Sequence, residues 1–243
     1  MASVLLLGAT SDMAVAIARK FAADKYDIIL AGRDMESLQA LQTDIQVRYN
    51  VKAVAVKFDV LDYSLHKMFY QQLPFKPDIS ICVVGYLGDQ QRAITDWNEA
   101  DKIIATDFTG PVSILNVIAE DYALRKSGII VGISSVAGER VRQSNYFYGS
   151  AKAGFTAYLS GLRNSLHKDG VHVVTVLPGF VYTKMTSNLK LPAILTATPN
   201  EVSAVVKKAV DSNKNVVYVK WFWRWIMLII KLIPESMFKK MKL

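Results

Sequence analysis

Three side chains in the middle of the chain are spaced so that they could move a proton to or from a substrate oxygen. Ser135 follows an apolar run over residues 128–133, which predicts a buried strand. Tyr148 and Lys152 stand four residues apart in a predicted helix over residues 148–167, so both side chains leave the same face. All three then lie at the carboxyl-end edge of a sheet, where open α/β sheets bind ligands. We expect the Lys152 ammonium to lower the pKa of the Tyr148 phenol, so that Tyr148 exchanges the proton while Ser135 hydrogen-bonds the oxygen.

Hydropathy patterns on either side of this Ser–Tyr–Lys trio predict the elements that position it. Short apolar runs alternate with helical patterns, an order typical of a parallel sheet covered on both faces. We predict strands over residues 3–7, 26–31, 51–58, 78–84, 171–177 and 216–219, and helices over 12–23, 35–49, from about 63, and 103–119. The expected fold is one α/β domain over residues 1–219, with a Rossmann-type doubly wound sheet, followed by an amphipathic helical tail over residues 220–243.

The composition and the distribution of charge exclude several classes of protein. The single cysteine, Cys82, lies in an apolar run, which excludes a disulfide framework and predicts a buried thiol. The N-terminal apolar run is too short for a signal peptide, so we expect a cytoplasmic protein. Residues 214–243 hold seven Lys or Arg and one Glu, which leaves only +2 of the net charge of +8 for the rest of the chain. The basic character therefore belongs to the tail, and no nucleic-acid partner is expected. No metal site is expected either, because the three histidines lie far apart and the sequence shows no Cys/His or paired-carboxylate cluster.

A glycine turn after the first strand is the candidate dinucleotide site. Gly8 would let the backbone approach a pyrophosphate at the N-terminus of the next helix, with Thr10, Ser11 and Met13 in the same turn. Asp12 is an unfavourable neighbour for a pyrophosphate, and capping the helix is its alternative role. A plain strand–turn–helix would explain this turn equally well if it stood alone.

Taken together, these motifs resemble the short-chain dehydrogenase/reductase family. Ser135, Tyr148 and Lys152 look like its catalytic triad, and residues 178–183, Pro-Gly-Phe-Val-Tyr-Thr, look like its Pro-Gly-x-Val-x-Thr segment. The resemblance implies an oxidoreductase that converts between a ketone and a secondary alcohol. It also implies that Tyr148 and Lys152 contact the dinucleotide and that the segment lies against the nicotinamide, with contacts from Pro178, Gly179, Val181 and Thr183. Residues 185–198 would follow as a substrate lid.

The resemblance to the family extends to the ends of three other predicted strands. Arg33 stands where NADP-preferring members carry a basic residue, which favours NADP(H) over NAD(H); the alternative is a solvated arginine with Asp34 selecting the cofactor. Asp59, with Val60 beside it, would meet the adenine amino group, or Asp59 would cap the next helix. Gly85 alone remains of the family's Asn-Asn-Ala-Gly and would pass close to the adenosine ribose.

Asp107 stands where the family commonly has an asparagine, the fourth member of its catalytic set. In the family this residue helps hold a water that links the lysine to solvent. A carboxylate could accept the same hydrogen bonds, but its charge would also attract Lys152. A polar residue at a helix kink is the alternative interpretation.

The tail combines tryptophans, aliphatic residues and lysines. Residues 221–234 are too short and too charged to span a bilayer. On a helical wheel Lys220, Arg224 and Lys231 form one stripe, and Lys239, Lys240 and Lys242 add a polybasic end. This pattern predicts an in-plane amphipathic anchor on an anionic membrane surface, at the inner face of the cell membrane. The alternatives are a helix that covers the domain's own core or a dimer contact.

Three stretches of the chain are similar to one subgroup of the family, the decaprenylphosphoryl-2-keto-β-D-erythro-pentose reductases. The stretches are residues 88–89, 137–146 and 233–240. The similarity implies a polyprenyl-phosphate-linked keto sugar as substrate, a flavin oxidase as partner, and a homo-oligomer. Two other interpretations stay open: a soluble reductase of small carbonyl compounds, and a non-catalytic dinucleotide-sensing protein.

Overall fold

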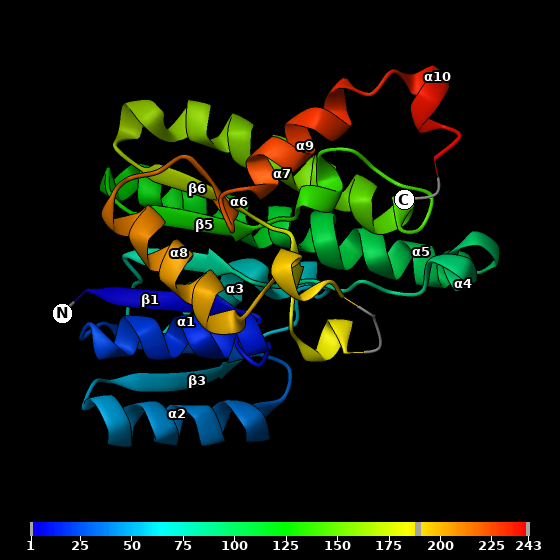
Figure 1. Ribbon diagram of the computed structural model, residues 1–243. Helices are drawn as coiled ribbons and strands as arrows, with labels where there is room; N and C mark the ends of the chain where they lie inside the picture. Colours follow the sequence, from blue (N-terminus) through cyan, green and yellow to red (C-terminus); the bar gives the residue numbers. More distant parts are fainter. Residues whose placement is uncertain (1, 188–190, 242–243) are drawn as a thin grey trace.

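Seven parallel strands form the centre of the protein, whose computed structural model describes residues 2–187 and 191–241 (Figure 1). The strand order is β3-β2-β1-β4-β5-β6-β9, and every neighbouring pair is parallel. The strands are β1 (Ser3–Leu7), β2 (Asp27–Gly32), β3 (Ala53–Lys57), β4 (Ile79–Cys82), β5 (Ile129–Ile133), β6 (His172–Pro178) and β9 (Val216–Val219). The order runs outward in both directions from the boundary between β1 and β4, which confirms the predicted doubly wound sheet.

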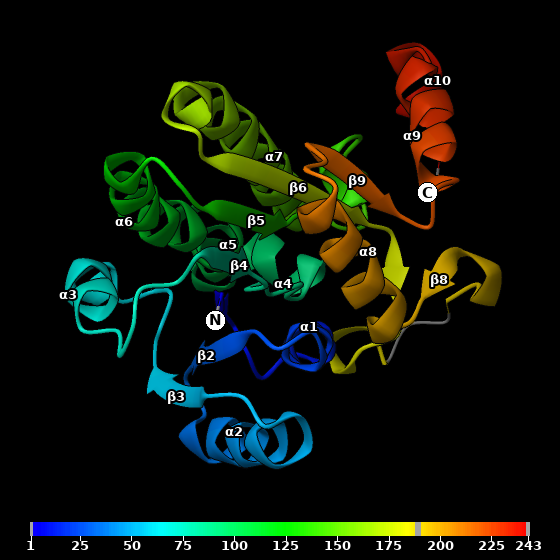
Figure 2. The same ribbon diagram turned by 90° about the vertical axis from the view of Figure 1, so that its left-hand side faces the viewer.

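Helices cover both faces of the sheet, which is why the central strands are apolar on both sides (Figure 2). One layer holds α1 (Asp12–Ala23), α2 (Met35–Tyr49) and α8 (Pro199–Asp211), and the other holds α3 (His66–Gln71), α6 (Gly110–Arg125) and α7 (Tyr146–Leu166). Successive residues of β1 face opposite cores: Leu6 packs in the α1–α8 layer, whereas Leu5 and Leu7 pack in the α6–α7 layer. Cys82 is a buried free thiol, as predicted.

The helix predicted over residues 103–119 is longer in the structure and is interrupted once. It begins with α5 (Trp97–Ile104), widens into a π turn over Ala105–Thr109, and continues as α6. Pro111 follows this turn and has no N–H to donate to the preceding turn of the helix. By length and composition Trp97–Arg125 could cross a membrane. Its inner side packs in the domain core, with Ile114 and Tyr122 buried, as expected of a core helix.

Several short elements lie within and after the segment of residues 178–183, and they were not predicted. β7 (Phe180–Val181) pairs with β8 (Thr196–Ala197), and the segment between them contains the 3₁₀ turns Lys184–Thr186 and Ala193–Leu195. Residues 188–190 of the predicted lid lie outside the described residues. The helices α4 (Gln90–Thr95) and α8 were also missed.

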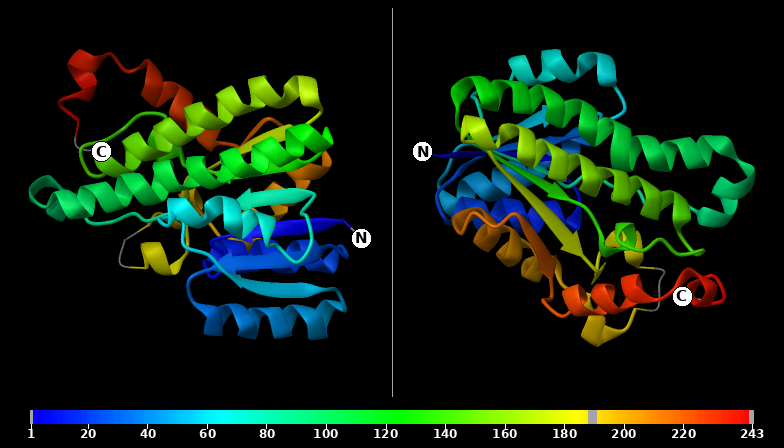
Figure 3. Two further views of the ribbon diagram at one scale, coloured as in Figure 1. Left: turned by 180° about the vertical axis from the view of Figure 1, so that it is seen from behind. Right: turned by 90° about the horizontal axis from the view of Figure 1, so that it is seen from above.

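The tail packs on the domain with one face and exposes the other. It forms α9 (Trp223–Leu232) and α10 (Glu235–Phe238). The inner tail face, Trp223 and Met227, is buried against Val136 and Leu177. The outer tail face is apolar and exposed; it consists of Trp221, Trp225, Leu228, Ile229 and Leu232. Figures 2 and 3 show α9 on the same side of the molecule as the lid segment that ends at β8.

The predicted basic stripe of the tail is largely neutralised. Lys220 pairs with Glu201 at 3.5 Å, and Lys231 pairs with Glu139 at 2.6 Å. Two of the three stripe charges are therefore matched by carboxylates of the domain itself. The polybasic end keeps Lys239 and Lys240 exposed, while Lys242 lies outside the described residues.

Two glycines allow a direct test of how closely α7 packs on the sheet. A Cβ at Gly132 in β5 would lie 2.3 Å from Leu159 Cδ1, whereas a Cβ at Gly161 in α7 would meet nothing within 4 Å. We expect Gly132→Ala to lower the free energy of unfolding by about 1–3 kcal/mol through overpacking. Gly161→Ala is the matched control and should raise it by about 0.5–1 kcal/mol through helix propensity. Urea denaturation of both variants measures the difference, and equal effects would contradict the packing described here.

Candidate active site at the carboxyl ends of the strands

Ser135, Tyr148 and Lys152 meet at the carboxyl-end edge of the sheet, as predicted. Ser135 follows β5 and caps the 3₁₀ turn Val136–Gly138, since its Oγ accepts a hydrogen bond of 3.1 Å from the Ala137 N–H. Tyr148 and Lys152 lie near the beginning of α7. The Ser135 hydroxyl also lies close enough to the Tyr148 phenol to lower its pKa. The hydroxyl, the phenol and the ammonium are therefore grouped around one point where a substrate oxygen could be placed.

A buried ion pair holds the lysine of this trio. Lys152 Nζ lies 3.0 Å from Asp107 Oδ1, and the two side chains are only 3% and 0% exposed. Lys152 also donates to the carbonyls of Ile133 and Val84, at 3.4 and 3.5 Å. The Asp107 carboxylate in turn accepts from the Tyr86 N–H at 3.2–3.3 Å. Asp107 therefore contacts Lys152 directly, in the wide π turn that presents it toward the sheet edge.

Burial and charge act in opposite directions on this pair. Burial raises the pKa of Asp107 to about 6, although the Lys152 charge and the hydrogen bonds from Lys152 and Tyr86 work against that rise. Burial alone would lower the pKa of Lys152, but the Asp107 carboxylate outweighs it and holds that pKa above its usual value. Lys152 is therefore positively charged throughout the neutral range.

The expected lowering of the Tyr148 pKa is wrong. Removal of the phenolate from water raises the pKa, and the Asp107 charge raises it further. The Lys152 charge lowers it, as expected, and so does Ser135, but by less than burial and Asp107 together raise it. Burial and the Asp107 charge together outweigh Lys152, and the phenol is protonated at neutral pH.

A cavity of about 310 Å³ lies beside this trio, at the switch point between β1 and β4. Seven of the residues predicted to bind the dinucleotide line it: Gly8, Thr10, Ser11, Arg33, Asp59, Val60 and Gly85. Gly8 has φ 83°, and a Cβ there would lie 3.1 Å from Val84 N, so only glycine allows this close approach. The cavity size and the backbone cradle suit the adenosine and phosphate end of a dinucleotide.

The glycine turn differs from the predictions in one respect. Ser11, not Asp12, caps α1, because Ser11 Oγ accepts the Ala14 N–H at 3.2 Å. Asp12 is the first residue of the helix, and its carboxylate accepts the Lys184 N–H at 2.7 Å. The side chain thus reaches across to the beginning of the lid segment. Met13 packs on the core at the edge of the same turn.

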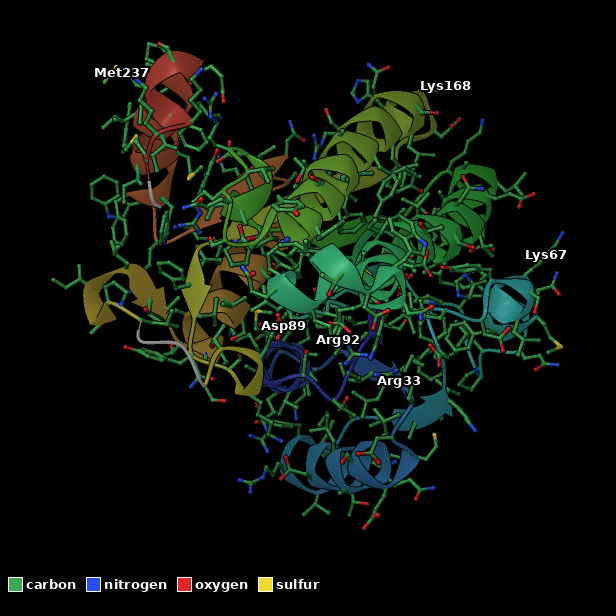
Figure 4. All side chains as sticks on the ribbon, turned by 90° about the vertical axis from the view of Figure 1, so that its right-hand side faces the viewer. Arg33, Lys67, Asp89, Arg92, Lys168 and Met237 are labelled. Atoms are coloured by element: carbon green, nitrogen blue, oxygen red, sulfur yellow. The ribbon has the colours of Figure 1, made fainter. Side chains whose placement is uncertain are left out.

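Two further acidic residues have their carboxylates engaged locally. Asp34 caps α2 by accepting hydrogen bonds from the Ser37 N–H and hydroxyl. Asp59 accepts the Leu61 N–H at 3.0 Å and forms a local turn, so the alternative of a helix cap is wrong for Asp59. Arg33, by contrast, is exposed at the cavity edge, as Figure 4 shows.

The predicted nicotinamide segment runs from the end of β6 through β7. Pro178 ends β6, and Val181 is buried and pairs with β8. Thr183 forms a reciprocal capping box with Thr186. Gly179 lies under the indole of Trp223, where a Cβ would come within 2.0 Å of the ring. This segment lines no part of the 310 Å³ cavity, which covers the other end of the predicted site.

Comparison with known proteins agrees with this geometry. The sequence profile of the short chain dehydrogenase family matches residues 2–193. The chain belongs to this family. A relative named an uncharacterized oxidoreductase, from Mycobacterium tuberculosis, is 34% identical over 243 residues, which are 99% of this chain and 97% of the relative. A serine 3-dehydrogenase of Agrobacterium fabrum is 29% identical over 224 residues, 89% of this chain and 86% of that one.

Solved structures show the same fold. A short-chain dehydrogenase from Sphingobium yanoikuyae in complex with NADPH superposes with a TM-score of 0.84 at 21% identity, covering 97% of this chain and 98% of that chain. The protein is thus a short chain dehydrogenase, an NAD(P)-dependent oxidoreductase that acts on CH–OH groups. The family profile ends at residue 193, so α8, β9 and the tail of this short chain dehydrogenase lie beyond it.

Tyr86, Lys102 and Glu99 are among the residues at the site that were not predicted from the sequence. Tyr86 and Lys102 line the cavity, and Lys102 Nζ lies 4.4 Å from the centre of the Tyr86 ring. The buried Glu99 accepts the Tyr86 hydroxyl at 2.8 Å and the Asp89 N–H at 3.0 Å. The amphipathic pattern of α5 marks Glu99 as an outlier, but nothing local links it to Tyr86.

The ion pair predicts the pH dependence of this short chain dehydrogenase. As the pH falls through about 6, Asp107 gains a proton and Lys152 loses its charged partner. We expect kcat for ketone reduction to fall on the acid side with a midpoint near pH 6. Asp107→Asn lacks the charge at every pH, so its profile should lack this limb, and its kcat at pH 8 should already be as low as that of the original protein below pH 6. Initial rates between pH 5 and 8 measure both, and an unchanged acid limb in the variant would contradict the assignment.

Proposed function

We propose that the protein is an NADPH-dependent ketone reductase whose substrate is a polyprenyl-phosphate-linked keto sugar at a membrane surface. The observation that carries the reductase assignment is the Ser135–Tyr148–Lys152 group with its buried Asp107 partner. The Tyr148 phenol carries its proton at neutral pH, and reduction of a ketone needs a proton donor at the oxygen.

The residues divide the reaction between them. Bound NADPH would supply a hydride to the carbonyl carbon. Ser135 hydrogen-bonds the carbonyl oxygen, and Tyr148 gives that oxygen its proton, so a ketone becomes a secondary alcohol. The phenolate left on Tyr148 is stabilised by the Lys152 charge, and a proton from solvent restores it. Asp107 holds Lys152 in place for this role.

The choice of NADPH rests on the edge of the cavity. An acid that accepts the ribose 2′-hydroxyl favours NAD, and an arginine accommodates the 2′-phosphate of NADP. Asp34 is occupied by the N-terminus of α2, whereas Arg33 is exposed at the cavity. Two structures of the same fold, the Sphingobium yanoikuyae dehydrogenase and the actinorhodin polyketide ketoreductase, are described with NADPH.

The lipid-linked substrate rests on the outer tail face and on the three stretches similar to the polyprenyl-linked sugar reductases. Trp221 is 74% exposed and Ile229 66% exposed. Burial of such side chains contributes roughly 1.5–3 kcal/mol each. Exposed Lys239 and Lys240 add about 1 kcal/mol each near an anionic surface. In this proposal the protein is cytoplasmic, binds the inner face of the membrane reversibly, and receives its keto sugar from a flavin oxidase.

A soluble reductase of small carbonyl compounds is the second candidate. The burial of Trp223 and Met227 favours it, because a tail that packs on its own domain needs no membrane. In that case the outer tail face would be an interface in a homo-oligomer. A non-catalytic sensor is disfavoured by the intact Ser–Tyr–Lys trio.

The first test removes the transferable proton. Tyr148→Phe keeps the ring, so we expect turnover of NADPH with a panel of soluble ketones and keto sugars to fall by about 10²–10⁴-fold. NADPH affinity should be largely retained. Lys152→Ala should reduce both turnover and NADPH affinity. Near-normal turnover by Tyr148→Phe would refute the proposed role of the phenol.

The second test concerns cofactor choice. Loss of a charge-assisted contact with phosphate costs roughly 1.5–3 kcal/mol, so Arg33→Ala should weaken NADPH binding about 10- to 150-fold. NADH binding should change less than threefold. The control is Lys67→Ala, which removes an exposed positive charge that lies far from Arg33 in Figure 4. Equal weakening of both cofactors would show that Arg33 does not discriminate between them.

The third test concerns the membrane. We expect the intact protein to sediment with vesicles containing anionic lipid, less so as the salt concentration rises. Trp225→Ser with Ile229→Ser should reduce the bound fraction at least tenfold. Leu124→Ser is the control, because Leu124 is an equally apolar side chain, 80% exposed, on α6. If the protein ignores vesicles but the double variant breaks an oligomer, the outer tail face is a protein interface.

A further inference from the structure

We infer that the tail is a positioning element of the active site, acting through Glu139 and Trp223. The inference rests on the proposed reductase function and extends it, since it assigns to the inner side of the tail a role separate from membrane binding. Both residues join the tail to segments that border the Ser–Tyr–Lys trio.

Glu139 connects the turn after Ser135 to the tail. It directly follows the turn Val136–Gly138, which Ser135 caps. Glu139 Oε1 accepts hydrogen bonds from Lys231 Nζ at 2.6 Å and from the Tyr218 hydroxyl at 3.0 Å. The Glu139 side chain is only 11% exposed, so solvent screens this pair little.

Arg140 strengthens the same connection. Its guanidinium donates to Glu235 Oε2 at 2.8 Å and to the Ile233 carbonyl at 3.3 Å. It also lies 4.1 Å from the centre of the Phe238 ring. Two consecutive residues of the loop after Ser135 are therefore fixed to β9, α9 and α10. Because Ser135 Oγ takes its direction from the Ala137 N–H, a shift of this loop moves the hydroxyl that contacts Tyr148.

Trp223 connects the tail to the opposite side of the site. Its indole covers Gly179 in the predicted nicotinamide segment, and Phe180 meets it edge to face at 5.6 Å between ring centres. Trp223 Nε1 donates to the Leu195 carbonyl at 3.2 Å, at the end of the lid segment. Val136, from the turn after Ser135, packs in the same cluster. One buried cluster therefore joins the turn after Ser135 to the predicted nicotinamide segment and the lid segment.

Small displacements of such segments are costly, because a misplacement of about 1 Å can reduce a rate about 10²-fold. No described residue of the tail lines the cavity that suits the adenosine end of the dinucleotide. Loss of the tail contacts should therefore reduce turnover without weakening NADPH binding. A variant that only folds less stably would instead lose turnover and NADPH binding together.

The experiment uses three variants of the full chain with NADPH and a soluble ketone, in the absence of vesicles. Glu139→Gln and Lys231→Gln each remove one charge of the pair, and Trp223→Phe removes the indole N–H. Lys231 is 42% exposed, so its substitution does not threaten the core. The matched control is Lys20→Gln, a lysine of 41% exposure that pairs with Asp24 on α1.

We expect kcat to fall at least fivefold in all three variants, with the Kd for NADPH within twofold of the original value and with Lys20→Gln unchanged. The Glu139→Gln and Lys231→Gln effects should not add in the double variant, since both break one contact. Values of kcat within twofold of the original in all three variants would overturn the inference.

An activity-independent measurement separates this inference from the proposed function. Amide hydrogen exchange in residues 136–140 should become faster in Lys231→Gln and stay unchanged in Lys20→Gln. A protein that reduces no ketone but shows this exchange difference would refute the proposed function alone. An active protein whose exchange and kcat are unaffected by all three substitutions would refute the positioning role alone.

Discussion

The Lys152–Asp107 ion pair is the interaction on which the rest of the site depends. Both groups are out of water, and leaving either one unpaired would cost about 3–5 kcal/mol. Their remaining hydrogen-bonding capacity is met by backbone groups, namely the Val84 and Ile133 carbonyls and the Tyr86 N–H. These groups belong to the ends of β4 and β5, so the pair requires both strands to end where they do. In return the pair fixes the ammonium beside Tyr148.

The fold satisfies this requirement through local departures from regular structure. The π turn places Asp107 at the sheet edge in the middle of an otherwise continuous helix. Gly85 leaves room for the pair, because a Cβ there would lie 3.2 Å from Asp107 Oδ1 and 3.5 Å from Lys152 Nζ. A π turn within a helix is uncommon and often marks a functional position. Burial raises the pKa of Tyr148, and the same carboxylate that orients Lys152 raises it further by offsetting part of the Lys152 field.

Much of the fold could be predicted because its signals are local. The apolar runs of β1 and β5, the helical patterns of α1 and α2, and the Tyr148–Lys152 spacing lie within short stretches of sequence. The Asp107 contact, the raised Tyr148 pKa and the Asp12–Lys184 hydrogen bond depend on residues 41 to 172 positions apart, and no local pattern encodes them. α8 was missed although its capping box, Thr198 with Glu201, is visible in the sequence. The tail was predicted as an anchor or a core cover, and it was the three-dimensional packing that divided its residues between two faces.

The contacts between the Ser135 loop and the tail also determine when the site is completed during synthesis. Lys231 lies 92 positions after Glu139, and Glu235 lies 95 positions after Arg140. A ribosome-bound chain that has just released α7 already contains Ser135, Tyr148, Lys152 and Asp107, but none of the tail groups that hold the loop. Contacts of such long range form late, since the chain between them must first be ordered. The loop beside Ser135 therefore takes its final position only after the tail has been synthesised.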